Sequence, residues 1–151
     1  MRRSEKEIRD RRVIDDLIHN AKVCRLAMCD EDIPYVVPVC FGYDGERIYV
    51  HSSREGKKLE VIRRNRQVCF EMEGETSIKK AETACKWSIE YTSVIGHGAA
   101  LIVDDAEGKR RGLDKIMEHY GGKGPFQYSE RALDNCVIIE IAINDLTCKG
   151  S

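Results

Sequence analysis

The chain has 151 residues and a mass of 17.2 kDa, and a hydrophobic share of 42% supports one core, which predicts a single domain over residues 1–151. Its 25 basic and 26 acidic residues leave a net charge of -1, without the basic excess that binding a phosphate backbone needs, so no nucleic-acid partner is expected. No apolar run approaches the ~20 residues of a membrane span, and the charged N-terminus lacks the apolar core of a secretory signal, which predicts a cytoplasmic protein without a membrane partner.

Seven cysteines are scattered along the chain, and no two of them have CxxC spacing. Most lie in apolar segments, where a thiol packs as a small hydrophobic group. In a reducing compartment this pattern favours buried thiols over a disulfide framework or a structural zinc site, so no metal site is expected. The cysteines are Cys24, Cys29, Cys40, Cys69, Cys85, Cys136 and Cys148.

Residues 1–22 are predicted to form an amphipathic N-terminal helix. Ser4 and Glu7 have the spacing of a capping box, and apolar residues then recur at helical intervals. The residues on this apolar face are Ile14, Leu17, Ile18 and Ala21.

Two runs rich in β-branched and aromatic residues, 23–29 and 35–43, follow as predicted strands. Pro38 has no N–H to donate within the second run, so that strand should lie at a sheet edge or carry a bulge. Asp44-Gly45 then predicts a hairpin turn into a strand over residues 46–51, because this pair readily takes the positive φ angles of a tight turn.

The hairpin leads directly into a second predicted helix. Ser52 and Glu55 form another capping box, and Asn65 is the expected end of the helix. A strand is therefore predicted to run straight into a helix N-terminus. The apolar residues of this helix are Leu59, Val61 and Ile62.

The next part of the chain predicts two strands separated by a polar stretch. Residues 67–73 alternate as a strand with one wet face, whereas residues 74–86 are weakly patterned and predict a loop excursion. Residues 87–104 alternate again, and the paired Gly96 and Gly98 predict a sharp bend at a barrel corner.

The last part of the chain predicts a helix, a helical turn over residues 129–133 and a strand over residues 136–143. Asp104 or Asp105 should cap the helix, and Gly121-Gly122 should end it. Its apolar face would comprise Leu113, Ile116, Met117 and Tyr120. Antiparallel strands around one core, with helices at the ends, predict a mainly β, α+β fold built on a barrel.

The junction between the strand over residues 46–51 and the following helix combines groups that suit an anion. A helix N-terminus offers unpaired N–H groups and about half a positive charge. Ser52 and Ser53 add hydroxyl donors, and Arg54, Lys57 and Lys58 add positive charge within one turn. The junction is a candidate phosphate site. Alternatively, the serines only cap the helix and the basic residues form a solvated face.

Several stretches, taken in order, resemble the nitroimidazole-resistance branch of the pyridoxamine 5'-phosphate oxidase-like, FMN-binding split barrels. The similarity extends over about residues 13–149. The stretches that carry it are residues 35–39, Asp44-Gly45, residues 48–52, 55–59 and 87–98, and the ending over residues 145–149.

The resemblance implies a six-stranded antiparallel split β-barrel with peripheral helices, which dimerises and holds FMN in clefts between the two subunits. Glu55 stands where the Ser-Arg-Lys motif of the pyridoxamine oxidases has its lysine. The residues that the resemblance places around the cofactor are Pro38, Val39, Val50, His51, Ser52, Ser53, Lys57, Lys58, Ser93, Val94 and Gly96.

His51 is the catalytic candidate, because the histidine at this place in the resembled branch lies beside the flavin and an imidazole can donate a proton near neutral pH. Alternatively, His51 only ends a strand. His97, between two glycines, could approach a ligand or mark a barrel corner. Trp87 and Tyr91 could stack on a flavin, or pack in the core or a dimer interface.

These features predict an FMN-dependent oxidoreductase that reduces a small organic acceptor, with nitro compounds as one candidate class and NAD(P)H as a candidate electron donor. A flavin-binding or storage protein without turnover is an alternative. A haem-binding split barrel with His51 or His97 as axial ligand is another. A nucleophilic Cys85 paired with a histidine is a further alternative, although nothing near it in the sequence would activate its thiol.

Overall fold

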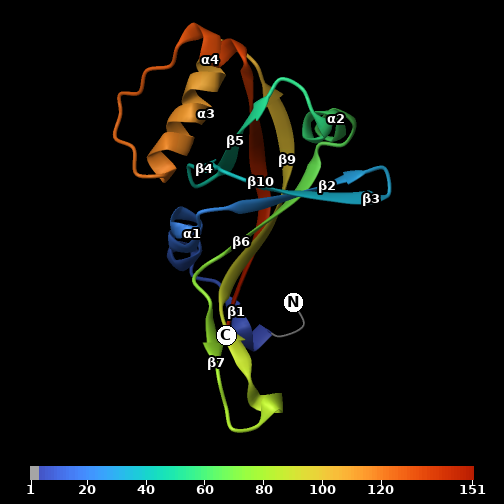
Figure 1. Cartoon of the computed structure of the whole chain (residues 1–151), viewed down its shortest axis with the longest axis vertical. Helices are drawn as coiled ribbons and strands as arrows, with labels where there is room; N and C mark the ends of the chain where they lie inside the picture. The colour runs from blue at the N-terminus through green and yellow to red at the C-terminus, as the bar shows by residue number, and fades with distance from the viewer. Residues whose placement is uncertain (1–3) are drawn as a thin grey trace.

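The computed structural model describes residues 4–151, and antiparallel strands dominate it (Figure 1). The helical elements are η1 (Ser4–Lys6), α1 (Arg11–Asn20), α2 (Lys57–Arg64), η2 (Ala84–Lys86), α3 (Ala106–His119) and α4 (Glu130–Asp134). The strands are β1 (Glu7–Ile8), β2 (Cys24–Asp30), β3 (Ile33–Val39), β4 (Gly42–Tyr43), β5 (Arg47–Ser53), β6 (Gln67–Glu73), β7 (Ser77–Lys79), β8 (Ser88–Glu90), β9 (Thr92–Val103) and β10 (Cys136–Gly150).

Eight strands form one sheet in the order β3-β2-β6-β9-β10-β5-β4, with the short β1 added to β10. The edge strands β3 and β4 are joined by only two residues, Cys40 and Phe41. Such a connection spans at most about 11 Å, so the two edges lie near each other and the sheet curls into a barrel. Six strands have at least seven residues, as the predicted six-stranded barrel requires, and β1 and β4 are two-residue additions.

The end of α3 holds two of the chain connections that shape the barrel. Phe41 is fully buried, its ring centroid lies 4.1 Å from that of His119, and its N–H donates to the Tyr120 hydroxyl at 3.2 Å. On the other side, His119 Nε2 donates to the Ala21 carbonyl and the Tyr120 hydroxyl donates to the Lys22 carbonyl, each at 2.8 Å. One helix end therefore anchors both the entry to β2 and the β3-to-β4 connection.

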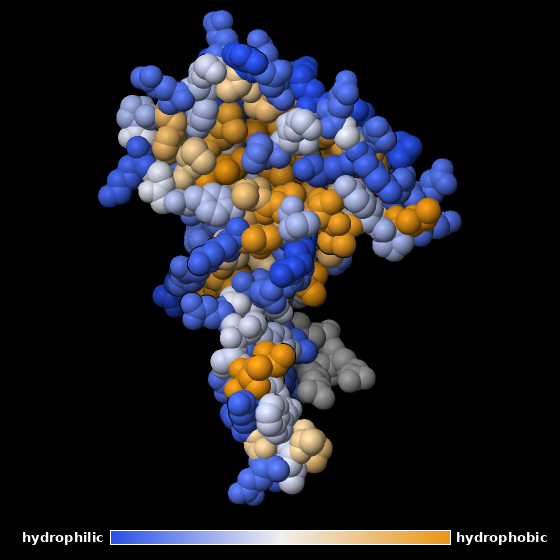
Figure 2. Space-filling model, viewed as in Figure 1, coloured by the Kyte–Doolittle hydropathy of each residue, from blue (hydrophilic) through white to orange (hydrophobic). Residues whose placement is uncertain are grey.

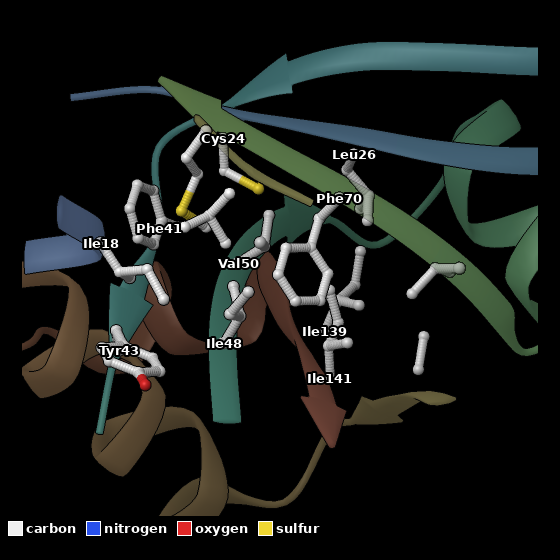
Figure 3. Close-up of a cluster of buried hydrophobic side chains, with 14 of the residues drawn as sticks. Ile18, Cys24, Leu26, Phe41, Tyr43, Ile48, Val50, Phe70, Ile139 and Ile141 are labelled. Carbon is white, nitrogen blue, oxygen red and sulfur yellow. The ribbon is translucent and has the colours of Figure 1, made fainter. Parts of the chain in front are cut away.

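The core lies inside the curled sheet, with α1 and the Phe41 connection closing its edge (Figure 3). The inward faces predicted for α1 and β6 are confirmed, since Ile18 and Phe70 are fully buried together with their neighbours on the same faces. Further fully buried side chains are Leu26, Ile48, Val50, Ile139 and Ile141.

The apolar face predicted for α3 is only partly confirmed. Ile116 is buried, whereas Met117 and Tyr120 remain 39% and 43% exposed. The helix approaches the sheet through glycines instead, and a Cβ at Gly112 would lie 2.7 Å from the side chain of Ile138. Glycine allows this close approach, and it carries no hydrophobic signal in the sequence.

The N-terminal helix begins later than predicted. Its N-cap is Asp10, whose carboxylate accepts from the Arg12 N–H, and the segment of the predicted Ser4 capping box forms η1 and β1 instead. Glu7 and Ile8 pair with the end of β10, so their backbone groups belong to the sheet and cannot begin a helix. Residues 1–3 of the predicted helix lie outside the described residues.

The predicted hairpin after the second strand is confirmed. Gly45 has φ 98°, and the Asp44 carboxylate accepts from the N–H groups of Glu46 and Arg47. The strand predicted over residues 35–43 is divided into β3 and β4 at the connection that joins the sheet edges. Pro38 does lie on an edge strand, because β3 pairs only with β2.

The paired glycines of β9 lie where the barrel is tightest. A Cβ at Gly96 would lie 2.3 Å from the Phe70 ring, and one at Gly98 would lie 2.4 Å from the Ala142 carbonyl oxygen. The neighbouring strand β10 has an irregularity between Ile143 and Asp145, opposite this segment, and then continues to Gly150. The last strand is therefore much longer than predicted, since the irregularity lets it bend and stay paired with β9.

The loop excursion predicted over residues 74–86 is only partly correct. It contains β7 and η2, and β7 pairs with β8, so the strand predicted over residues 87–104 is divided into β8 and β9. Together β7, η2 and β8 form a two-stranded arm that extends away from the barrel in Figure 1. The alternation of polar and apolar side chains in β7 covers only a serine, an isoleucine and a lysine. A pattern this short is not enough to predict a strand.

None of the helices within residues 4–151 is both long and apolar enough to span a membrane.

We predict that Gly98→Ala destabilises the protein by about 1–3 kcal/mol, because the added methyl group would meet the backbone of β10 and force the two strands apart. Chemical denaturation at equilibrium measures the change. Gly74→Ala is the control, since its Cβ would meet mainly the Thr92 hydroxyl, which can rotate away. Equal stability of the two variants would contradict the tight approach at Gly98.

We also predict that the barrel loses stability as the pH falls below about 6.5. Burial and the nearby His19 lower the pKa of His119 from its usual 6.5, and its buried Nδ1 lacks a hydrogen-bond partner among the described residues. The unfolded chain therefore takes up this proton at a higher pH than the folded chain, so stability decreases from about pH 6.5 down to the lowered pKa. In urea titrations across this range, His119→Gln should show a smaller decrease than the wild type.

Candidate functional site

The junction between β5 and α2 differs from the predicted capping box. Ser52 and Ser53 pair with Val137 and Cys136 of β10, so they belong to the strand and do not cap the helix. The N-cap is Gly56, with φ 130°, a backbone angle that side-chain-bearing residues rarely adopt. Three residues therefore separate the end of β5 from the start of α2, and a Cβ at Gly56 would meet no atom within 4 Å.

The first turn of α2 presents backbone donors to this open side. The N–H groups of Leu59 and Glu60 donate to the Gly56 carbonyl, at 3.0 and 3.2 Å. The amides of Lys57 and Lys58 precede them, and the first amides of a helix have no intrahelical acceptor. Two backbone N–H groups and the positive end of the helix dipole are thus available at the junction.

The two lysines at the junction are in different electrostatic environments. Lys57 Nζ lies 3.9 Å from an Asp30 carboxylate oxygen and 4.8 Å from the centroid of the Tyr35 ring. Lys58 is half-buried, desolvation lowers the pKa of its ammonium, and no carboxylate within residues 4–151 lies within 4.0 Å of it. Lys58 is therefore a partly desolvated cation without a counter-ion among the residues that the structure describes.

The hydroxyl groups and Arg54 are arranged less favourably than expected. Ser52 is 8% exposed, and the Ser53 hydroxyl donates to the Glu55 carbonyl at 2.8 Å. Arg54 turns away from the junction, since its Nη1 donates to Asp104 at 2.8 Å and to the Asp134 carbonyl at 3.1 Å. Arg54 belongs to a structural network of α3 and α4 and does not add charge to the candidate site.

That network also contains Lys109, a residue which the sequence analysis did not single out. Lys109 is 4% exposed, and its Nζ lies 2.8 Å from Asp104 Oδ1 and 2.6 Å from the Leu133 carbonyl. Arg54 and Lys109 together hold the pKa of Asp104 below its usual value. The partners are far apart in the sequence, so no local pattern predicts them.

His51 and Val50 lie next to each other on β5 and point to opposite faces of the sheet. Val50 is fully buried in the core, so its side chain does not border an external ligand. His51 is exposed and pairs across the sheet with Ile138, and its imidazole makes no hydrogen bond with the described residues. Its imidazole is therefore free to meet a bound molecule.

Pro38 and Val39 lie at the end of the edge strand β3. Pro38 is exposed on the outer face of the sheet, whereas Val39 packs partly against the core. The contact between Tyr35 and Lys57 connects the middle of β3 to the first turn of α2. The edge strand and the helix junction thus belong to one region of the surface.

Within one chain, Ser93, Val94 and Gly96 lie far along the sheet from His51 and the junction of β5 with α2. His51 pairs with Ile138, and Ile138 pairs with Val103 at the far end of β9. Gly96 and Ser93 lie seven and ten residues before Val103, or about 23 and 33 Å along the strand. Val94 is also fully buried, so its side chain points into the core.

His97 has a partner that sequence reasoning missed. Its Nδ1 lies 3.2 Å from an Asp145 oxygen on β10, and its other cross-strand neighbour is Cys69 of β6. The three side chains form a row on the outer face of the sheet, and burial together with Asp145 raises the pKa of the Cys69 thiol. The raised pKa disfavours the thiolate, so this row does not activate Cys69 as a nucleophile.

Cys85 is exposed on the arm, with its Sγ 3.7 Å from the Thr83 hydroxyl. Among the described residues, no hydrogen bond or ion pair joins the Cys85 thiol to a histidine or a cation. Within residues 4–151, no three His, Cys, Asp or Glu side chains are grouped so as to hold a metal ion.

Two hollows of about 600 and 590 Å³ open on the surface, and neither includes the β5-to-α2 junction. One lies beside the irregularity of β10, next to Arg11 and Arg47, and the other lies between the start of β2 and the end of β6. The candidate site is thus an open face of one chain, with Ser93, Val94 and Gly96 far from it and Val50 in the core.

Comparison with known proteins defines the class of protein. The family model for pyridoxamine 5'-phosphate oxidase matches residues 10–149. A crystal structure of a candidate 5-nitroimidazole antibiotic resistance protein from Bacteroides thetaiotaomicron is 33% identical, with a TM-score of 0.84, over 95% of this chain and 86% of that one. An FAD and haem binding protein from Mycobacterium smegmatis is 19% identical, with a TM-score of 0.85, over 97% of this chain and 73% of that one.

The chain belongs to the pyridoxamine 5'-phosphate oxidase family, and its fold is the split barrel that the sequence resemblance implied. A curated protein of Rhizobium meliloti, described as uncharacterized, is 36% identical over 50 residues. That match spans about a third of each chain, 33% of this one and 32% of the relative.

Proposed function

We propose that the protein is an FMN-dependent oxidoreductase that works as a homodimer and reduces a small organic acceptor, with nitro compounds as the leading class. The observation that carries the proposal is Lys58, a half-buried ammonium that has no counter-ion within residues 4–151 and lies next to the free amides of the first turn of α2. The family assignment and the 33% identity to a nitroimidazole-resistance candidate support the choice of a flavin and of this acceptor class.

The donor set at the junction fits a phosphate monoester, the group that ends FMN. Such a group carries up to two negative charges, and Lys58 together with two helix amides supplies the compensating charge and hydrogen bonds. Gly56 leaves open space where a side chain would stand. Ser52, Ser53 and Lys57 would complete the phosphate end, and Pro38, Val39 and His51 would border the ring.

Bound FMN would supply two-electron transfer from a reduced nicotinamide to the acceptor, chemistry that no side chain of the chain provides. His51 would hold a proton at its exposed imidazole and donate it to the acceptor as the acceptor gains electrons. The same position leaves His51 clear of the core, so its replacement need not disturb the barrel.

A second subunit is part of this proposal, because one chain separates the candidate residues of β9 from those of β5 and α2. Ser93 and Gly96 lie about 33 and 23 Å along β9 from the level of His51. Two chains packed side by side in opposite directions would bring this end of one β9 to the junction of the other, and symmetric pairs are the commonest assemblies. A cleft between two copies would also enclose a face that is open in a single chain.

Two measurements distinguish this proposal from its alternatives, a flavin-binding protein without turnover and a haem-binding barrel. The absorption spectrum of the purified protein distinguishes two broad flavin bands from the single sharp band of haem. Bleaching of the bound flavin by NADH or NADPH, followed by reoxidation with a nitro compound, distinguishes turnover from storage.

We predict that Lys58→Ala weakens FMN binding at least several-fold, since a charge-assisted contact with phosphate contributes about 1.5–3 kcal/mol. Calorimetric titration of the flavin-free protein with FMN measures the affinity, and titration with riboflavin, which lacks the phosphate, should show little difference between variant and wild type.

Two neighbouring substitutions serve as matched controls for Lys58→Ala. Arg54→Ala should leave FMN affinity unchanged because Arg54 is bound to Asp104, and Lys57→Ala should have a smaller effect because Lys57 already has Asp30 nearby. Unchanged FMN affinity in Lys58→Ala would remove the phosphate from this junction.

We predict that His51→Ala retains bound flavin but reduces the acceptor at least tenfold more slowly, because the proton donor is lost. Stopped-flow spectroscopy follows reduction by NAD(P)H and reoxidation by the acceptor separately. Only the reoxidation step should slow, and normal reoxidation would contradict the proton-donor role of His51.

A further inference from the structure

The β7-β8 arm has one apolar face and one polar face. Ile78 and Ile89 pair across its two strands and are 66% and 53% exposed. Trp87, two residues before Ile89 and on the same side by strand alternation, is 51% exposed. Figure 2 shows apolar surface on the arm, separated by polar surface from the apolar surface of the barrel.

The opposite face of the arm is already satisfied by its own polar contacts. Glu90 accepts from the Ser77 hydroxyl and from Lys79 Nζ, both at 3.2 Å. The loop at the tip is braced as well, since Trp87 Nε1 donates to the Ala81 carbonyl at 2.8 Å. The polar face suits water. On the apolar face, Lys80 Nζ lies 5.8 Å from the centroid of the Trp87 ring, and Ile78 and Ile89 remain more than half exposed among the described residues.

A two-stranded hairpin standing alone in water is marginally stable. The arm nevertheless forms a regular hairpin, so we expect its apolar side to pack against a surface that excludes water. The barrel offers such a surface: the outer face of its sheet also leaves large hydrophobic side chains uncovered. These are Val36 of β3 and Ile95 and Leu101 of β9, which are 43–60% exposed.

The arm and this outer face are continuous along one strand direction. Arm strand β8 leads through Tyr91 into β9, which carries Ile95 and Leu101. In a two-fold symmetric dimer, each chain has both an arm and an outer sheet face. If the arm of one chain contacts the barrel of the other, symmetry therefore produces the same contact a second time. Stable interfaces bury roughly 800 Å² on each partner, and a reciprocal contact supplies twice the apolar area of a single one.

We propose that the arm docks with its apolar face on a second copy of this chain, so that the two subunits exchange arms. Ile78, Trp87 and Ile89 of one chain are the contact residues. The inference rests on the homodimer of the proposed function and deepens it by naming the element that grips the partner. It does not depend on which cofactor is bound.

Trp87 is the only tryptophan of the chain, so its fluorescence reports on the arm directly. Acrylamide quenching of the flavin-free protein measures access to Trp87, and sedimentation velocity on the same samples measures the oligomeric state. We expect a dimer in which the quenching constant of Trp87 is at least threefold lower than in the variant Ile78→Ser/Ile89→Ser. Dilution of the wild type into the monomer range should raise the constant in step with dissociation.

The variant also tests the grip of the arm on the partner. Ile78→Ser/Ile89→Ser should weaken the dimer at least tenfold, whereas the control Lys79→Ser, on the polar face, should leave both dimer and quenching unchanged. A dimer with Trp87 as accessible as in the variant would overturn arm exchange and leave the homodimer standing. A Trp87 equally shielded in the monomer, a variant with unchanged dimerisation, or a wild type that is monomeric throughout would also overturn it.

Discussion

The barrel depends on the short connection between the two edges of its sheet. Only Cys40 and Phe41 separate β3 from β4, so the edges are held near each other and the sheet must curl. Phe41 anchors this connection by burying its ring beside His119 and donating its N–H to Tyr120. The same helix end holds the start of β2, which means that α3 sets the shape of the barrel although it contributes little apolar surface of its own.

The candidate site follows from this closure. Curling brings the first turn of α2 to the edge strand, as the contact of Lys57 with Tyr35 shows, and β5 delivers His51 to the outer face beside it. Some polar groups at the junction already have hydrogen-bond partners, and others do not. Arg54 and Ser53 are already bonded within the chain, whereas Lys58 and the first amides of α2 are not. The proposed anion site at the junction therefore depends on fewer groups than its composition suggests, and those groups are neighbours in the first turn of α2.

One chain leaves several features incomplete. The site residues of β9 lie far along the strand from those of β5 and α2, and the arm exposes an apolar face. Both features have the same geometric cause, since β9 and its extension into β8 form a continuous path longer than the barrel itself (Figure 1). A second copy would satisfy both, and this links the cofactor proposal to the arm exchange through one surface.

Local patterns in the sequence were sufficient for the elements whose cause is local. The alternation of β6, the Asp44-Gly45 turn, the cap of α3 at Asp105 and the edge position of Pro38 all depend on neighbouring residues or on the missing N–H of proline. The succession of motifs also indicated the family and its barrel.

Only the tertiary structure decided the features that depend on pairing partners. Ser4 and Ser52 each begin a sequence with the spacing of a helix cap. However, Glu7 and Ile8, which follow Ser4, pair with β10, and so does Ser52 itself, so both segments belong to the sheet. The bond of Arg54 with Asp104, the row of Cys69, His97 and Asp145, and the pairing of Ile78 with Ile89 join residues on different elements. Helix capping and hydrophobic periodicity depend on residues within one turn or a few positions of each other, so they can be recognised directly in the sequence. Sheet register and ion pairing depend on residues that meet only in space, so they became visible only in the folded structure.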